Sequence, residues 1–448
     1  MQKRNYGLFT AITMIMGIVI GSGIFFKADD ILTYAKGNVT LGVVIFCVAA
    51  IAIVFGSLSI SQLATRTDKP GGLVSYAESF VGMGTATVFG WFETFLYLPT
   101  LCAVVAWASG IYVSQLMGYT DFSVGRNTII GAIVITVFYF FNTLSAKLGG
   151  LFQNASMIIK LIPLVLIAVL GLAFGHPAQT VSESYKTFSQ SVGGLGWIAA
   201  FGPVAFSFDG WIVSTSICHE IKDSKKNLPI ALSIAPIAVL AVYLAYFIGI
   251  SSYVGPEAIL EHGDSAVYIA AERFFGSWGA KVTLVAVVIS ILGTVNGVVL
   301  GLIRLPYSLA LRNMMPCSHV FKKECKKLGG MPVNSSILIY CLSMFYLLVH
   351  HLLTSSGVFG SHDISEISIC MLYMLYIILY VAVIRLCKKG EIKSKFLGYV
   401  VPVLAIIGSL IIFSGAVTSM IFLLYVAICG AFIAGSFIYY KTHKNVIK

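Results

Sequence analysis

Residues 17–26 of the chain read GIVIGSGIFF, from Gly17 to Phe26. Glycine stands at positions 17, 21 and 23, in the middle of an apolar stretch that is long enough to cross a membrane as a helix. Glycine weakens the interior of a helix, because it loses more backbone freedom on folding than any other residue. The sequence therefore predicts a membrane-spanning helix that is interrupted near its centre, over about residues 20–23.

A helix that is interrupted inside a membrane offers its backbone groups to a ligand. The amides of residues 22–24 would begin a second half-helix, whose partial positive charge suits a carboxylate. The freed carbonyls of residues 18–20 could accept hydrogen bonds from an ammonium group. The alternative is close helix packing on Gly17 and Gly21, which stand four residues apart. The candidate substrate-binding residues of this stretch are Ile18, Val19, Ile20, Gly21, Ser22, Gly23 and Ile24.

A second interruption is predicted five spans later, in residues 201–211, which read FGPVAFSFDGW. This stretch contains a proline, a glycine and the acidic Asp209 within an apolar span. Breaks at matching places in two halves of a chain point to a transporter with its site near the middle of the membrane. We expect Phe206, Ser207 and Asp209 to contribute to that site. Asp209 could receive a substrate ammonium group, but we favour a role as the cap of the second half-helix.

The composition excludes a soluble domain, because 58% of the 448 residues are hydrophobic and only 10% are charged. The apolar runs are continuous and about 20 residues long or longer, as transmembrane helices require and barrel strands do not. We therefore predict an all-α integral membrane protein that forms one transporter domain. Its repeats would cover residues 8–175 and 193–386, with peripheral spans in 396–440. The twelve predicted spans are residues 8–34, 39–64, 84–117, 126–145, 150–175, 193–219, 228–253, 276–311, 333–353, 364–386, 396–415 and 417–440.

The formal net charge of +11 predicts an orientation in the membrane. If both termini lie in the cytoplasm, most of the 29 Lys and Arg residues fall in inner segments, as the positive-inside rule requires. We therefore expect a multi-pass protein of the cell membrane. The basic residues stand between apolar runs and form no soluble basic face, so we exclude nucleic acid as a partner.

Lys160 lies near the middle of the fifth span, where a charged side chain costs about 2.5–3.5 kcal/mol on insertion scales. The unwound carbonyls of the first span could accept hydrogen bonds from its ammonium group. A fixed positive charge at that place would occupy the position of a sodium ion, which argues against sodium coupling. The alternative is a permanent ion pair between Lys160 and either Asp209 or Glu93.

Two further polar residues lie deep in apolar runs, Tyr243 in span 7 and Asn296 in span 8. A polar group in hydrocarbon must be satisfied by a neighbouring helix or must line a polar pathway. For both residues the sequence leaves these two interpretations open. We regard them, with Lys160, as candidates for transport or coupling.

These motifs together resemble those of the amino acid, polyamine and organocation superfamily. The likeness is closest to the L-type amino acid transporter branch and, within it, to bacterial serine/threonine exchangers. It covers nearly the whole chain, with its motifs in the same order. The segments that carry it are GIVIGSGIF at 17–25, DKPGG at 68–72 with Tyr76, KLIP at 160–163, FSFDGW at 206–211, Glu220 with KKNLP at 225–229, and Asn296 with Gly297.

The resemblance implies a LeuT-type fold with two inverted five-helix repeats, and a sodium-independent exchange of neutral L-amino acids. It implies that the amides of residues 21–23 hold the substrate carboxylate and that Phe206 acts as a gate. Lys160 and Tyr243 would position the first span and help to handle the substrate. The chain departs from many L-type members at Asp209, where those members carry glycine.

Other functions are weighed against this one. A transporter of cationic amino acids or polyamines could use Asp209 or Glu93 to hold the additional positive charge. An integral-membrane enzyme would need a catalytic constellation, but His219 and Glu220 are followed by no second histidine at zinc spacing. An ion channel is the remaining alternative. We expect an amino acid substrate and the lipid bilayer as partners, with no cofactor, no metal and no obligatory protein partner.

Overall fold

The computed structural model describes residues 7–447 except 22, 68, 70, 120, 213–220, 359–361 and 420. In this part of the chain, helices are the only regular secondary structure apart from one isolated bridge between Cys325 and Met331. The prediction of an all-α protein is therefore confirmed. Ten described segments are long and apolar enough to cross a membrane.

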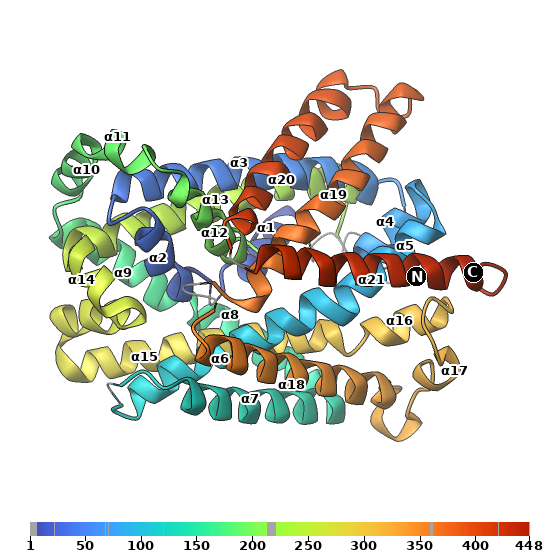
Figure 1. Ribbon diagram of the computed structural model, residues 1–448, viewed down its shortest axis with the longest axis horizontal. Helices are drawn as coiled ribbons and strands as arrows, with labels where there is room; N and C mark the ends of the chain where they lie inside the picture. The colour runs from blue at the N-terminus through green and yellow to red at the C-terminus, as the bar shows by residue number, and fades with distance from the viewer. Residues whose placement is uncertain are drawn as a thin grey trace.

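Figure 1 shows most of the helices lying side by side along the long axis of the molecule. In that view α19 and α20 project above α3, α7 lies near the bottom, and α1, α2 and α12 lie between α3 and α7. The elements are α1 (Leu8–Val19), α2 (Gly23–Tyr34), α3 (Val39–Ala64), α4 (Gly72–Phe80), α5 (Met83–Phe92), η1 (Glu93–Tyr97), α6 (Leu98–Leu116), α7 (Val124–Leu144), α8 (Ala146–Ile159), α9 (Leu161–Phe174), α10 (Pro177–Lys186), α11 (Phe188–Val192), η2 (Leu195–Ala200), α12 (Phe201–Ser207), α13 (Ser224–Val254), α14 (Pro256–His262), η4 (Gly263–Ser265), α15 (Ala266–Leu302), α16 (Leu305–Leu311), α17 (Ser318–Phe321), η5 (Lys326–Leu328), α18 (Val333–Ser355), α19 (Ile364–Lys388), η6 (Phe396–Val400), α20 (Val401–Val417) and α21 (Phe422–Thr442).

The first span is interrupted where the glycines predict it. Helix α1 ends at Val19, and Ile20 adopts an extended backbone with φ −69° and ψ 100°. The chain resumes as α2 at Gly23. In the sixth span, α12 ends at Ser207, and Gly210 has a positive φ of 92°. The second half of this span falls largely on residues 213–220, outside the described residues.

The predicted start of the eighth span, at residue 276, coincides with a break in α15. This element runs from Ala266 to Leu302, but the backbone of Gly276 is not helical, with φ 70° and ψ −179°. The residues before Gly276 therefore form a helix of their own, and the eighth span follows it. At its other end α15 stops at Leu302, and the short helix α16 follows from Leu305.

Spans that stand five apart in the sequence pack against each other. Half-helix α2 contacts α12, α3 contacts α13, α6 contacts α15, and α7 contacts α18. The two interrupted spans are therefore neighbours, and spans 2, 7, 10 and 11 also contact them. This arrangement brings backbone groups from both breaks to the centre of the bundle.

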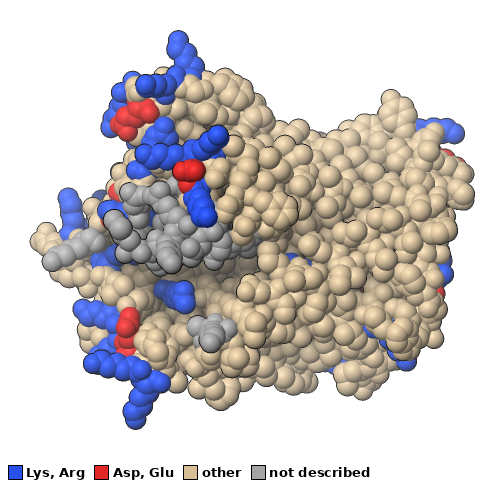
Figure 2. Space-filling model, turned by 180° about the vertical axis from the view of Figure 1, so that it is seen from behind, with Lys and Arg blue, Asp and Glu red and all other residues tan. Residues whose placement is uncertain are grey.

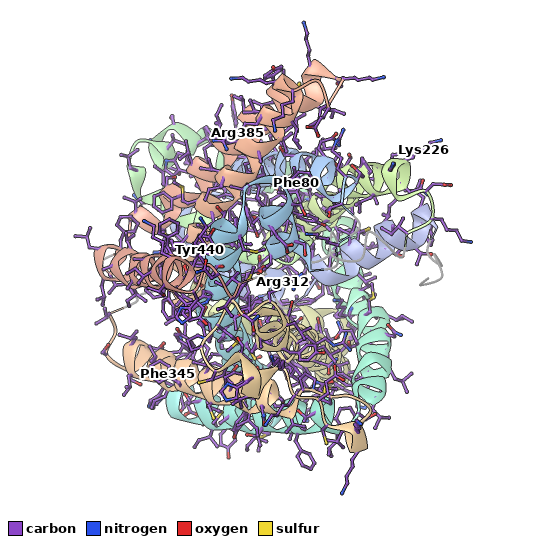
Figure 3. The ribbon with its side chains drawn as sticks, turned by 90° about the vertical axis from the view of Figure 1, so that its right-hand side faces the viewer. Phe80, Lys226, Arg312, Phe345, Arg385 and Tyr440 are labelled. Atoms are coloured by element: carbon purple, nitrogen blue, oxygen red, sulfur yellow. The ribbon has the colours of Figure 1, made fainter. Side chains whose placement is uncertain are left out.

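The two ends of the bundle differ in charge. Figure 2 shows Lys and Arg side chains gathered at one end, with a long face between the ends that carries few charges. Figure 3 looks onto the basic end, where Lys226, Arg312 and Arg385 come from three separate segments. This distribution agrees with the sorting of charges that the sequence predicts.

Helices α9 and α13 pack closely where Gly171 meets Gly249, and this contact allows the packing of the bundle to be tested. A Cβ atom at Gly171 would lie 2.5 Å from backbone atoms of Gly249, so we expect Gly171→Ala to lower the melting temperature of the purified protein. Gly150 in α8 is the matched control, because a Cβ atom there meets nothing within 4 Å. Gly150→Ala should leave the melting temperature unchanged or raise it slightly. Equal melting temperatures for the two variants would contradict the packing.

Candidate functional site

A cavity of about 290 Å³ lies at the place where the two interrupted spans meet spans 3, 5 and 8. Ile20 and Ile24 are fully buried. The side chain of Ile18 and the whole of Ser22 lie outside the described residues. The predicted site residues that line the cavity are Val19, Gly21, Gly23, Lys160, Phe206 and Asp209. A mostly apolar cavity with a few polar groups is typical of a site for a small molecule.

The cavity extends toward the basic end of the bundle. Its lining includes Leu300 and Gly301 near the end of α15, and Gly301 is exposed. Figure 2 shows a hollow in the surface at that same end. Polar residues that the sequence did not single out also line the cavity, namely Tyr97, Gln153 and Thr294. A ligand could therefore reach the breaks from the basic end.

Lys160 stands at the joint between α8 and α9, and its side chain is buried. Its ammonium group donates a hydrogen bond to the carbonyl of Gly17 in α1. Among the described residues it forms no ion pair with Asp209 or Glu93, so the alternative of a permanent pair is not what the structure contains. The predicted contact with span 1 is present, one residue earlier than the carbonyls of residues 18–20. A positive charge thus supports the first half-helix just before its break.

Tyr243 ties the two breaks together from span 7. Its hydroxyl group lies 3.1 Å from the carbonyl oxygen of Val19 and 2.8 Å from that of Ser207, and can donate to either. The hydroxyl of Ser207 lies 3.0 Å from the carbonyl oxygen of Pro203 and 3.2 Å from that of Gly23, and can donate to either. Gly23 must be small here, because a Cβ atom would lie 2.7 Å from the Cα atom of Ser207. Tyr243 can therefore satisfy a carbonyl that the end of α1 or of α12 leaves free.

Asp209 follows the end of α12 and faces the cavity. Its carboxylate accepts a hydrogen bond from the hydroxyl of Tyr97 at 2.5 Å. The predicted role as a cap of the second half-helix falls on residues beyond the described ones. The side-chain partner that the structure does place on Asp209 comes from span 3, which the sequence gave no reason to expect.

Asn296 is fully buried and holds three spans together. Its side-chain amide donates to the carbonyl of Gly149 and to the side chain of Gln153, both at 3.0 Å, and accepts from Asn142 at 2.9 Å. Of the two interpretations that the sequence left open, the structure shows the first: the Asn296 side chain forms its hydrogen bonds with neighbouring helices. Because Gln153 lines the cavity, Asn296 can affect the site only through that neighbour.

Residues 6–446 match the model of a protein family described as amino acid permease. The chain belongs to the amino acid permease family. The serine/threonine exchanger SteT of Bacillus subtilis strain 168 is 29% identical over 411 residues, which cover 91% of this chain and 90% of the relative. The human cystine/glutamate transporter is 26% identical, with 77% of this chain and 68% of the relative covered. The mouse large neutral amino acids transporter small subunit 2 is 27% identical, with 78% and 65% covered.

A cluster of charged residues in this permease is centred on Lys27 in α2. We define the Lys27 cluster as Lys27, Asp30, Asp363 and Glu366. The Lys27 ammonium lies 3.1 Å from the Asp30 carboxylate, 2.9 Å from that of Asp363 and 2.7 Å from that of Glu366. The Lys27 side chain is 1% exposed. Lys27 also lies 5.6 Å from the ring centre of Phe206, so the cluster adjoins the cavity.

The Lys27 cluster was not predicted, because no pattern in the sequence relates Lys27 to Asp363 or Glu366. Asp363 caps α19, accepting from the amides of Ser365 at 2.7 Å and Glu366 at 3.1 Å. Burial alone would raise the pKa of the Asp363 carboxyl. The positive charge of Lys27, together with other charges and hydrogen bonds nearby, outweighs burial and lowers that pKa to about 2.

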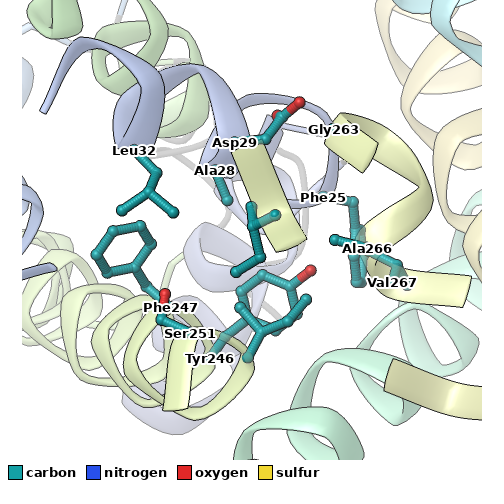
Figure 4. A pocket seen from close by; sticks show the side chains of 12 residues that line it. Phe25, Ala28, Asp29, Leu32, Tyr246, Phe247, Ser251, Gly263, Ala266 and Val267 are labelled. Atoms are coloured by element: carbon teal, nitrogen blue, oxygen red, sulfur yellow. The ribbon is translucent and has the colours of Figure 1, made fainter. Parts of the chain in front are cut away.

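A second, much smaller cavity lies near Asp29 in α2, between this half-helix and α13 (Figure 4). Its volume is about 10 Å³, which is room for about one water molecule. Tyr246 and Ser251 from α13 line it together with Phe25. Since an amino acid does not fit there, the larger cavity at the breaks is the candidate site.

The Lys27 cluster predicts that two variants, each with one lysine replaced by methionine, differ in melting temperature. Lys27→Met leaves the buried carboxylates of Asp363 and Glu366 without their ammonium partner, a loss of about 3–5 kcal/mol for a broken buried pair. We expect it to lower the melting temperature of the purified protein clearly. Lys69→Met is the control, because the Lys69 side chain is 57% exposed and its pair with Glu78 contributes at most about 1 kcal/mol. Equal melting temperatures for the two variants would contradict the buried cluster.

Proposed function

We propose that the protein is a sodium-independent transporter that exchanges small or other neutral L-amino acids across the cell membrane. The observation that carries the proposal is the cavity at two interrupted spans, lined by Lys160 and by glycines of the first break. The relatives named above, an exchanger of serine and threonine and transporters of other amino acids, support the choice of an amino acid as substrate.

The substrate's charged ends fit the groups at the first break. Helix α2 begins at Gly23, and its N-terminal amides would bind the carboxylate of an amino acid. Carbonyl oxygens at the end of α1, around residues 18–20, would accept hydrogen bonds from its ammonium group. The side chain would then lie beside Phe206, which also lines the cavity and would close over it. A cavity of about 290 Å³ favours a small side chain.

Sodium independence is proposed on the position of Lys160. Its ammonium group occupies the space beside the α1 carbonyls where a bound cation would otherwise be needed. A protein ammonium that permanently supports these carbonyls makes a sodium ion unnecessary for holding the broken span in shape.

We further propose that spans 1–5 and 6–10 form inverted repeats in a LeuT-type arrangement, with both termini in the cytoplasm. The packing of spans that stand five apart in the sequence supports the repeats. The gathering of Lys and Arg at one end supports the orientation. In this orientation the cavity extends toward the cytoplasm and the Lys27 cluster closes the outer side. Exchange then requires the Lys27 cluster to separate while the inner side closes.

A transporter of cationic amino acids or polyamines is the second candidate. Asp209 favours it, because a carboxylate that lines the cavity could hold an additional positive charge.

We propose that the protein acts as a transporter and not as an enzyme, and that a single polypeptide suffices for transport. The name of the mouse relative calls that protein a small subunit.

The proposal predicts exchange by the purified protein alone in proteoliposomes. Vesicles loaded with unlabelled serine should take up labelled serine several-fold faster than empty vesicles. Replacing external sodium by choline should leave the rate unchanged. Equal uptake into loaded and empty vesicles would contradict exchange, a sodium requirement would contradict the role of Lys160, and competition by lysine but not by alanine would favour the second candidate.

Replacing Lys160 tests how the first span is supported. We expect Lys160→Ala to reduce serine exchange by more than about tenfold, since a lost hydrogen bond to a charged group corresponds to at least that factor. Expression and the elution profile in size-exclusion chromatography should stay close to those of the wild type. Lys281→Ala is the control, because Lys281 is exposed on α15. Normal exchange kinetics for Lys160→Ala would refute the assigned role.

A further inference from the structure

The pair formed by Tyr97 and Asp209 is a part of the cavity that the proposed function does not use. Tyr97 ends η1, a π-helical turn in the middle of span 3, and its side chain is nearly buried. Such turns interrupt the α-helical register and are frequent at functional sites. Both residues line the cavity, and the distance of 2.5 Å between the hydroxyl and the carboxylate oxygen makes this a short hydrogen bond.

The carboxylate of Asp209 has no cation beside it in the described part of the chain. No ion pair joins it to Lys160, whose ammonium group is directed to Gly17. A carboxylate removed from water needs hydrogen-bond donors or a positive charge. Tyr97 supplies such a donor, and a tyrosine hydroxyl has only one proton to give. The hydroxyl of Tyr97 is therefore committed to Asp209 and keeps this charge satisfied within the protein.

We propose that Tyr97 determines the charge selectivity of the substrate site, by satisfying Asp209 in place of a cationic substrate side chain. The site then selects neutral amino acids although a carboxylate lines it. This inference rests on the proposed function, since it concerns the side-chain part of the same cavity. Without the hydroxyl, Asp209 would lose its side-chain donor and keep the backbone amide of Gly210. A substrate with a cationic side chain would then gain binding energy by taking the place of the hydroxyl.

The test compares the uptake of labelled lysine with that of labelled serine in proteoliposomes loaded with both amino acids unlabelled. The quantity measured is the ratio of the two initial rates. We expect Tyr97→Phe to raise the ratio of lysine to serine roughly tenfold or more, as for the loss of a hydrogen bond to a charged group. The double variant Tyr97→Phe with Asp209→Asn should return the ratio to the wild-type value or below, because the carboxylate is then absent.

Tyr346→Phe is the matched control. The hydroxyl of Tyr346 also donates a hydrogen bond, at 2.8 Å to the carbonyl of Phe95, but Tyr346 does not line the cavity. The ratio of lysine to serine uptake by the Tyr346→Phe variant should equal that of the wild type. If Tyr97→Phe lost all exchange, the shift of its melting temperature on adding lysine or serine would replace the uptake ratio, and a larger shift with lysine is expected.

An unchanged ratio in Tyr97→Phe would overturn the inference, as would a raised ratio that persists in the double variant. A folded Asp209→Asn variant with no serine exchange at all would also overturn it, because Asp209 would then hold the ammonium group common to all amino acids. Failure of the wild type to exchange serine would overturn the proposed function and this inference together. Serine exchange by the wild type with an unchanged ratio in Tyr97→Phe overturns the inference alone.

Discussion

Backbone groups that lose their helical partners inside a membrane must find other partners, because hydrocarbon offers none. The break between α1 and α2 creates this demand, and two side chains from other spans meet it. Lys160 donates to the carbonyl of Gly17, and Tyr243 can donate to that of Val19. These bonds hold spans 5 and 7 against the first span. The same bonds leave amides at the start of α2 available to a ligand.

The charged groups within the bundle divide between its two halves. Around the cavity they are few and lie apart, with Lys160 bound to a carbonyl and Asp209 bound to a hydroxyl. At the far side of Phe206, by contrast, the Lys27 cluster joins α2 to the start of α19 through contacts of 2.7 and 2.9 Å. Buried ion pairs contribute little net stability, because desolvation offsets their attraction. A contact of this kind can hold one end of a transporter closed and still open during a transport cycle.

The sequence predicted the parts of the site that depend on local pattern. Glycines at 17, 21 and 23 indicated the first break, and the proline and Asp209 indicated the second. Lys160 was recognised because a charge in the middle of an apolar span is costly. Its acceptor in span 1 could be inferred, since unwound carbonyls were the available partners. Phe206 was placed beside the cavity by its position next to the break.

The remaining parts of the site depend on which face of each helix meets which neighbour. The sequence pattern within one span does not contain this information. Tyr97 is one of 22 tyrosines and stands in an apolar span like any packed aromatic residue. Lys27 and Glu366 each lie near the end of a predicted span, where a charge normally meets water. Only the fold brings them within 2.7 Å of each other. Asn296 was noticed as polar, but its partners in spans 4 and 5 could not be deduced.

The most direct test is an experimental structure of the wild-type protein with saturating serine. We predict that the serine carboxylate lies against the amides at the start of α2, between Lys160 and Phe206, with the Lys160 ammonium group still bound to the carbonyl of Gly17. Serine found outside the cavity at the two breaks, or a Lys160 ammonium group paired with the substrate carboxylate, would contradict the proposed site.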